Sequence, residues 1–385
     1  MSLRTIISSS LSRATQNPHS NFKHHHTPLT MCKTALHGAL HALPKCEHHL
    51  HIEGSLSPSL LFRLAALNNV PLPDSTLDPS FTSISALEER YLHFTSLNDF
   101  LHYYFIGMSV LLTAGDFESL AYEYFVRAHS DGVQHAEIFF DPQAHTHRGV
   151  PYKTVLEGLS AAQKRAEEEF GLTSKLILCF LRHMSETDAD VAYQEAVSLG
   201  HFSNGTIAGI GLDSSEVGFP PEIFREVYAA AKEAGIKRTA HAGEEGDSSY
   251  IQKALDICHT ERIDHGIRLV DDEVLLKRVA REKTLVTMCP LSNVRLRCVG
   301  KVADLPVRRF LDEGVRFSIN SDDPAYFGGY ILDNYCAVQE AFGLTLAEWK
   351  GIAEGAIEGS WCDESRKKAL LSKVGEWAEK YEGVA

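Results

Sequence analysis

Two histidines separated by one residue begin the part of the chain that could carry out chemistry. His49 and His51 lie in the segment Glu47–Gly54 (EHHLHIEG), which we expect to lie on a β-strand. Side chains alternate between the two faces of a strand, so these two imidazoles share one face and His48 points away. Two imidazoles on one face are well placed to bind one divalent metal ion. The pair is a weak signal by itself, because His-rich surface strands also contain it.

Three later segments add polar residues at the ends of apolar runs. His241 and Glu244 lie in TAHAGE, His265 lies in IDHG, and Asp322 and Asp323 lie in SINSDDP. If these runs are parallel strands of one barrel, the polar residues meet at its carboxyl end. Three histidines and one aspartate would form an N3O site with room for water, which is the pattern of catalytic zinc.

The remaining polar residues have alternative roles. Glu244 could exchange a proton with a substrate, or it could be a carboxylate that stabilises a helix N-terminus. His265 could accept or orient the proton of the water, or it could be a further metal ligand. Only one of Asp322 and Asp323 can point at the metal, which leaves the other for the substrate or for a backbone cap.

Eight short β-rich runs alternate with amphipathic helical segments from residue 45 onward. This alternation predicts parallel β/α units of the α/β class, and eight of them predict a closed (β/α)8 TIM barrel. A long, aromatic-rich helical insertion at 56–130 follows the first strand, and two or three helices follow Leu344. The clearest helix covers 222–235. The candidate strands are 45–51, 133–140, 175–181, 206–213, 236–242, 262–265, 284–288 and 315–320.

The composition of the 385 residues limits the possible partners. No apolar run approaches the ~20 residues that a membrane helix needs. The formal net charge is −14, and because residues 1–46 carry five basic and no acidic residues, the rest of the chain carries −19. A body this acidic repels phosphate backbones, which argues against nucleic acid as a partner.

Residues 1–43 are expected to form a disordered or targeting-like leader, and 44–385 a single domain. The acid-free leader resembles a mitochondrial transit peptide in composition, but no clear amphipathic helix forms around its arginines. The alternative is an unselected leader with Met31 as the working start. Because the leader lacks the apolar region of a secretory signal, we expect the protein in the cytoplasm, with the nucleus as a second compartment.

The motifs KCEHHLHIEG, GLDSSE, TAHAGE, IDHG and SINSDDP resemble the adenosine/adenine deaminase group of the amidohydrolase superfamily. The resemblance covers residues 44 to 345. Within the group, the segments FFDPQAHTHRG, GLDSSEVGFPPE and SDDPAYFGGY are most similar to fungal-type adenine deaminases.

The resemblance implies a zinc-dependent hydrolytic deamination of adenine to hypoxanthine and ammonia, as in purine salvage. It assigns Glu244 as the proton donor, His265 as the catalytic histidine and Asp323 as a substrate-binding residue. Iron or manganese could replace zinc, and the oligomeric state stays open. The implied metal ligands are His49, His51, His241 and Asp322.

Two positions depart from the nucleoside deaminases of the group. Glu53 stands where they commonly have an aspartate, and its longer side chain could crowd a ribose. Ser215 or Glu216 stands where they carry a glycine that contacts purine N3. Glu53 and Glu216 are therefore candidate substrate-binding residues for a base without ribose.

Three alternatives remain at this point. The chain could deaminate adenosine or another 6-substituted purine nucleoside or nucleotide. It could be a binuclear amidohydrolase, although those need a lysine at the end of the fourth strand, where this chain has Asp213 to Glu216. It could also be an inactive protein that binds metal or purine, which the presence of Glu244 and His265 disfavours.

Overall fold

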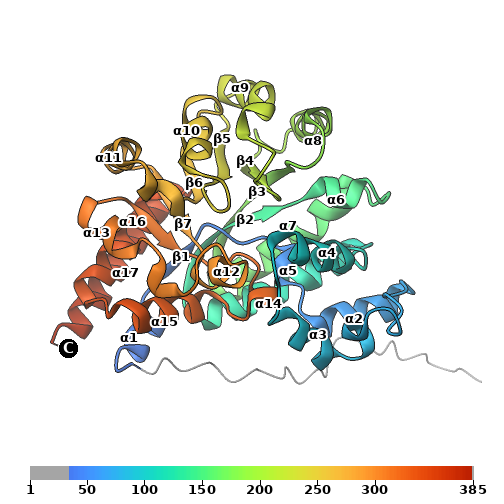
Figure 1. The fold of residues 1–385 in the computed structure, drawn as a ribbon, viewed down its shortest axis with the longest axis horizontal. Coiled ribbons are helices and arrows are strands. Elements are labelled where there is room, and N and C mark those ends of the chain that lie inside the picture. Colours follow the sequence, from blue (N-terminus) through green and yellow to red (C-terminus); the bar gives the residue numbers. More distant parts are fainter. Residues whose placement is uncertain (1–33, 384–385) are drawn as a thin grey trace, which may run out of the picture. The chain divides into compact units, whose positions relative to one another are not determined.

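Eight parallel strands form the centre of the computed structural model, which describes residues 34–383 (Figure 1). Each strand pairs with the next one along the chain. A parallel bridge between Leu50 and Asp322 joins the ends of the first and last strands and closes the ring. The predicted (β/α)8 barrel is therefore confirmed. The strands are β1 (Lys45–Glu47), β2 (Val133–Phe140), β3 (Thr173–Leu181), β4 (Ile207–Asp213), β5 (Lys237–Ala242), β6 (Arg262–His265), β7 (Leu285–Met288) and β8 (Phe317–Ile319).

Helices connect successive strands on the outside of the barrel, as parallel pairing requires. The helix predicted over 222–235 begins with a 3-10 turn, η3 (Pro221–Phe224), before α9 (Arg225–Glu233). Its buried residues include Val227 and Tyr228, which face the barrel. The other connecting helices are α5 (Ala114–Ser130), α7 (Tyr152–Phe170), α8 (Glu186–Ser198), α10 (Ser248–Asp256), α11 (Glu273–Glu282) and α13 (Val307–Glu313).

The first strand contains an irregularity that strict alternation did not predict. Cys46 pairs with His135, and His51 pairs with Phe139. The chain therefore uses five residues on the first strand where β2 uses four. The register also shifts in the opposite sense between Lys45 and Cys46, where β2 has the extra residue, so the pairing of the first strand is irregular at two places. His48 lies outside the histidine cluster, as alternation predicts, and it is fully buried, with Glu137 and Arg262 among its charged neighbours.

The insertion predicted over 56–130 consists of helices that pack beside the barrel, and its last helix is α5. The phenyl ring of Phe100 lies 4.7 Å from that of Phe327, between ring centroids. Phe327 belongs to a short helix after β8, so these aromatic residues join the insertion to the barrel. The earlier helices of the insertion are α2 (Pro58–Asn68), η2 (Pro79–Thr82), α3 (Ile84–Tyr91) and α4 (Leu97–Met108).

Helices α15 (Ile331–Phe342), α16 (Leu346–Gly359) and α17 (Glu364–Tyr381) end the described chain, in agreement with the prediction. They pack against α1 (His37–Ala42), where Trp377 Nε1 donates to the Ala39 carbonyl at 2.8 Å. The ordered fold therefore begins before residue 44. Residues 1–33, with most of the expected leader and Met31, lie outside the described residues. Between residues 34 and 383, no helix is long and apolar enough to cross a membrane.

Candidate active site

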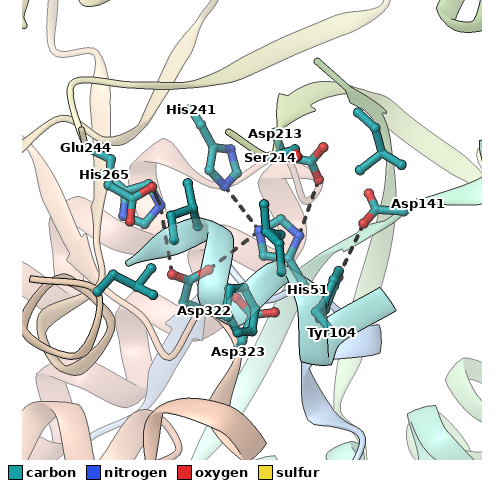
Figure 2. Close-up of a pocket in the computed structure, with 15 residues that line it drawn as sticks. His51, Tyr104, Asp141, Asp213, Ser214, His241, Glu244, His265, Asp322 and Asp323 are labelled. Carbon is teal, nitrogen blue, oxygen red and sulfur yellow. Dashed lines mark hydrogen bonds and ion pairs between the residues drawn. The ribbon is translucent and has the colours of Figure 1, made fainter. Parts of the chain in front are cut away.

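Four side chains from three places in the barrel meet at its carboxyl end, and Figure 2 shows three of them. His49 and His51 follow β1, His241 lies in β5, and Asp322 follows β8. All four are buried, and one donor atom from each lies within 4.8 Å of the others. Asp322 Oδ1 lies 3.1 Å from His49 Nε2 and 3.5 Å from His51 Nε2. The Nε2 atoms of His51 and His241 are 3.1 Å apart. The structure thus brings the four predicted ligands together.

A buried aspartate, Asp264, orients the imidazoles of His49 and His241. His49 Nδ1 lies 2.8 Å from Thr287 Oγ1, and Thr287 Oγ1 donates to Asp264 Oδ1 at 3.0 Å. His49 therefore carries its proton on Nδ1 and keeps Nε2 free. Asp264 Oδ2 lies 3.7 Å from His241 Nδ1. Such partners fix the tautomer and direction of metal-binding histidines. Sequence reasoning did not single out Asp264 or Thr287, although Asp264 directly precedes His265.

The cluster fits a divalent metal ion. His49 Nε2 is buried and has no hydrogen-bond partner among the described residues. Burial lowers the pKa of His51 to about 3. Burial acts to raise the pKa of Asp322, but His49, His265 and His51 hold it below its usual value. Neutral imidazoles and an ionised carboxylate are the forms that bind metal ions.

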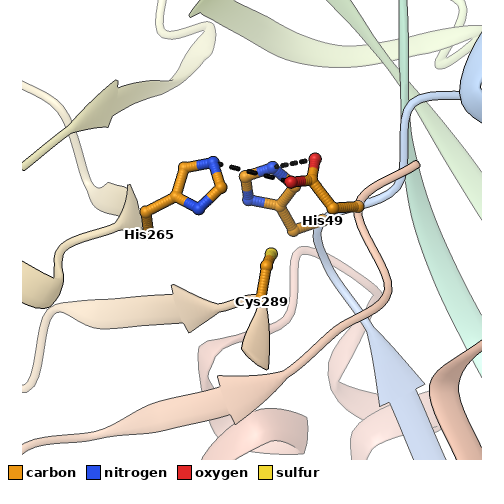
Figure 3. A group of neighbouring side chains, drawn as sticks. His49, His265 and Cys289 are labelled. Atoms are coloured by element: carbon orange, nitrogen blue, oxygen red, sulfur yellow. Dashed lines mark ion pairs between the residues drawn. The ribbon is translucent and has the colours of Figure 1, made fainter. Parts of the chain in front are cut away.

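Two further sets of potential metal ligands share residues with this cluster. One combines Cys289 with His49, His265 and Asp322, and Figure 3 shows the Cys289 thiol close to both histidines. Burial raises the pKa of this thiol well above its usual value, and nearby Asp322 raises it further. The thiolate is the ligand form of cysteine, so the His3Asp set fits a metal better. The second grouping joins His51 to Asp141 and Asp213.

Glu244 and His265 lie beside the cluster. His265 Nε2 lies 3.5 Å from Glu244 Oε2 and 3.9 Å from Asp322 Oδ2. Asn293 Nδ2 lies 3.2 Å from His265 Nδ1 and donates to it, so the imidazole proton is on Nε2 and faces the site. Burial raises the pKa of Glu244 well above its usual value, and the charges of Asp322 and Glu216 add to the effect. The raised pKa favours the protonated form of Glu244, which is the form that can donate a proton.

The two adjacent aspartates, Asp322 and Asp323, differ in backbone conformation and in the direction of their pKa shifts. Asp322 takes a left-handed backbone conformation with φ of +64°, which turns the chain at the end of β8. Asp323 follows, with φ of −117° and ψ of +73°, and precedes Pro324, which starts the short helix α14 (Pro324–Phe327). Burial and the charge of Asp322 raise the pKa of Asp323 well above its usual value. The environment thus favours the ionised form of Asp322 and the protonated form of Asp323, as expected when two environments separate the pKa values of paired carboxyls.

Glu216 does not line the pocket as the prediction of a substrate contact requires. Its Oε1 accepts the backbone N–H of Gly243 at 2.6 Å. Its Oε2 accepts the N–H groups of Glu244, Glu245 and Gly246 at 3.0, 2.8 and 2.9 Å. The carboxylate therefore holds the loop that carries Glu244.

Glu53 also differs from its predicted setting. Its Oε1 lies 2.8 Å from His145 Nε2 and accepts the backbone N–H of Asp141 at 3.1 Å. Glu53 is buried beneath the pocket rather than among its lining residues. Its carboxylate contacts the backbone of Asp141, and the side chain of Asp141 lines the pocket.

Asp141 and Asp213 are pocket residues that sequence reasoning missed. Asp213 Oδ2 lies 3.4 Å from His51 Nδ1 and orients that imidazole. Asp141 directly follows β2 and precedes Pro142, which starts the short helix α6 (Pro142–Thr146). The same Asp-Pro step follows β8 at Asp323, so this repeated pair was the signal that could have identified Asp141.

Helix α4 of the insertion covers the pocket with apolar and aromatic side chains. Leu97, Phe100, Leu101 and Tyr104 all line it. An apolar cover excludes water and strengthens the electrostatic interactions inside. Part of the aromatic-rich insertion therefore packs over the pocket.

The barrel and its buried histidine–aspartate cluster define a protein of the amidohydrolase type. The chain matches the family described as adenosine deaminase over residues 44–377, and it therefore belongs to that family. It is 57% identical to an adenine deaminase of Aspergillus oryzae, over 91% of this chain and 99% of the relative. It is 56% identical to an adenine deaminase of Schizosaccharomyces pombe, over 91% and 95% of the two chains.

Two solved structures resemble the whole barrel. The crystal structure of an adenine deaminase from Arthrobacter aurescens has a TM-score of 0.81 and 46% identity, covering 87% of this chain and 99% of the other. A zinc-bound amidohydrolase from Burkholderia ambifaria has a TM-score of 0.75 and 26% identity, covering 91% and 95%.

Proposed function

We propose that the chain is an adenine deaminase, which hydrolyses the 6-amino group of adenine and releases hypoxanthine and ammonia. The observation that carries the proposal is the position of Glu244, a buried acid with a raised pKa, beside His265 and the His3Asp cluster. The identity of 57% to the adenine deaminase of Aspergillus oryzae supports adenine as the substrate.

The proposed metal ligands are His49, His51, His241 and Asp322. Three nitrogen donors and one carboxylate suit Zn²⁺, while Fe²⁺ or Mn²⁺ would also accept this set. When bound, the metal ion supplies a Lewis acid that lowers the pKa of a water from 15.7 to about 7.

The protein side chains donate and accept the protons that the reaction moves. Glu244 gives its proton to purine N1, which makes C6 electrophilic, and Asp323 donates a hydrogen bond to N7. His265 donates from Nε2 to the oxygen of the attacking water, and Asp322 Oδ2 accepts a proton from that water. The tetrahedral carbon at C6 then expels the amine as ammonia. One water proton leaves on ammonia and the other returns to Glu244, so the protons balance.

The first test is ammonia release from purified protein of known metal content, with adenine and adenosine as substrates. We expect turnover of adenine, much lower turnover of adenosine, and one metal ion per chain. A chelator should abolish turnover, and Zn²⁺ should restore it. Preference for adenosine would refute the proposed substrate, and two ions per chain would point to a binuclear enzyme.

A further inference from the structure

The pocket has a second polar side that the proposed reaction does not use. Figure 2 shows Asp141 and Tyr104 on the far side of His51 from Glu244 and His265. Asp141 comes from the end of β2 and Tyr104 from the covering helix α4, and both line the pocket. The reacting groups and this second side therefore face the two ends of any ligand that fills the pocket.

The Asp141 carboxyl group lacks a full set of partners. Its Oδ2 accepts a hydrogen bond from the Tyr104 hydroxyl at 3.3 Å. Its Oδ1 is buried and has no hydrogen-bond partner among the described residues. The residue as a whole is only 1% exposed. A buried oxygen without a partner costs free energy, so one that lines a pocket points to a ligand that completes it.

The missing partner must be a hydrogen-bond donor at the imidazole end of the purine. This step rests on the proposed function, in which N1 faces Glu244, C6 faces the histidine cluster and N7 faces Asp323. The purine then extends from Glu244 towards Asp141, with its five-membered ring at the Asp141 end. With N7 accepting from Asp323, the N–H of that ring is on N9. Free adenine has this N–H, whereas adenosine carries its sugar there.

We propose that Asp141 is a specificity residue that accepts a hydrogen bond from the N9–H of the free base and thereby selects adenine over N9-substituted purines. A ligand without that proton leaves Asp141 Oδ1 buried and unpaired. A site built to bind an N–H or O–H group rejects analogues that lack it by ~10⁴–10⁵-fold in kcat/KM. Discrimination by Asp141 therefore suffices to separate the base from its nucleoside.

The test compares adenine with 9-methyladenine, which keeps N1, C6 and N7 but lacks the N9–H. We expect wild-type protein to prefer adenine by about 10⁴-fold in kcat/KM. Asp141→Ala should lose about 10²-fold or more on adenine and little on 9-methyladenine. Asp141→Asn keeps the shape and a weaker neutral acceptor, so it should fall between wild type and Asp141→Ala. Asp190→Asn, an exposed carboxylate on α8, is the matched control and should leave both rates unchanged.

A binding measurement gives a readout independent of turnover. Calorimetry with hypoxanthine and 9-methylhypoxanthine should show the same preference in wild type and its loss in Asp141→Ala. Equal losses on both ligands in the variant would assign Asp141 a structural role and overturn the proposal. Equal use of adenine and 9-methyladenine by wild type would overturn it without affecting the proposed reaction. If wild type releases no ammonia from adenine, the proposed function itself fails.

Discussion

At the scale of single residues, the site separates the protonation states of neighbouring carboxyl groups. Asp322 lies among three imidazoles that hold its pKa low against the effect of burial, whereas Asp323 and Glu244 lie close to its negative charge. Burial raises the pKa of the latter two, and the charge of Asp322 raises it further. The negative charge of Asp322 thus favours the protonated forms of Glu244 and Asp323, which are the forms that can donate.

The first prediction concerns the acid. Glu244→Gln keeps the size of the side chain but removes its transferable proton, so kcat should fall about 10²–10⁴-fold. Wild-type kcat/KM should decline as the pH rises through the raised pKa of Glu244, because only the protonated form donates. The variant should lack this decline. The measurement is a pH–rate profile of ammonia release with metal content checked at each point. An identical alkaline decline in both proteins would contradict the role of Glu244.

Residue types predicted much of the site, but not the contacts of the longer side chains. His49 and His51 could be predicted as metal ligands because the HxH pair and the later strand ends allow few arrangements. The contacts of Glu53 and Glu216 could not be predicted, because their partners are backbone N–H groups and a histidine distant in sequence. The position of Glu216 in GLDSSE gives no sign that its carboxylate turns toward the loop after β5.

At the scale of elements, the loop after β5 depends on a carboxylate from the loop after β4. Four successive N–H groups, from Gly243 to Gly246, point at the two oxygens of Glu216. Gly243 takes a left-handed conformation with φ of +76°, which lets the first of them turn inward. Glu216 is therefore a positioning residue that sets the place of Glu244.

The second prediction follows from this arrangement. Glu216→Gln replaces one oxygen with an NH2 group, which faces an N–H of the loop and leaves it unpaired. An unpaired buried group costs about 1–3 kcal/mol of stability. A shift of Glu244 by ~1 Å should lower kcat by up to about 10²-fold.

The effect should fall mainly on kcat, because Glu216 is not among the residues that line the pocket. Steady-state kinetics and thermal unfolding measure the two effects. Glu245→Gln, a half-buried carboxylate in the same loop, is the control and should change kcat little. A Glu216→Gln protein with wild-type kcat would show that the loop holds its shape without the carboxylate.

Most strands could be predicted from the sequence to within a few residues, because buried parallel strands are continuous apolar runs. Strand β1 could not be predicted in the same detail. Its bulge is set by the register of β2, since Cys46 pairs with His135 and His51 with Phe139. A pairing register belongs to two distant segments, and alternation along one segment does not reveal it.

At the scale of the whole molecule, a buried ion pair joins the interior of the barrel to the C-terminal helices. Arg262 in β6 donates to Glu137 in β2, and both side chains are fully buried. Glu137 also accepts from Ser360 Oγ at 2.8 Å and from the Trp361 backbone N–H. Arg262 stacks on the Trp361 ring at 4.1 Å. Residues 360 and 361 connect α16 to α17, so the pair fixes these helices to the barrel.

The last prediction tests this connection. Glu137→Gln leaves Arg262 buried without its counter-ion, and such a loss costs about 3–5 kcal/mol of unfolding free energy. Glu358→Gln breaks an exposed pair with Arg316 and should cost no more than about 1 kcal/mol. Urea unfolding measures both. Glu137 lies four residues before Asp141, or roughly 13 Å along the strand, so kcat of the folded variant should change little.

The pH dependence gives this prediction a second check. Burial acts to raise the pKa of Glu137, but Arg262 and His135 hold it well below its usual value. A depressed pKa contributes stability that is fully present above the unfolded-state value of about 4.3 and is lost as the pH falls toward the folded-state value. The difference in stability between wild type and Glu137→Gln should therefore narrow below about pH 4. A difference that stays constant from pH 7 to pH 3 would mean that Glu137 stabilises the barrel by its shape and not by its charge.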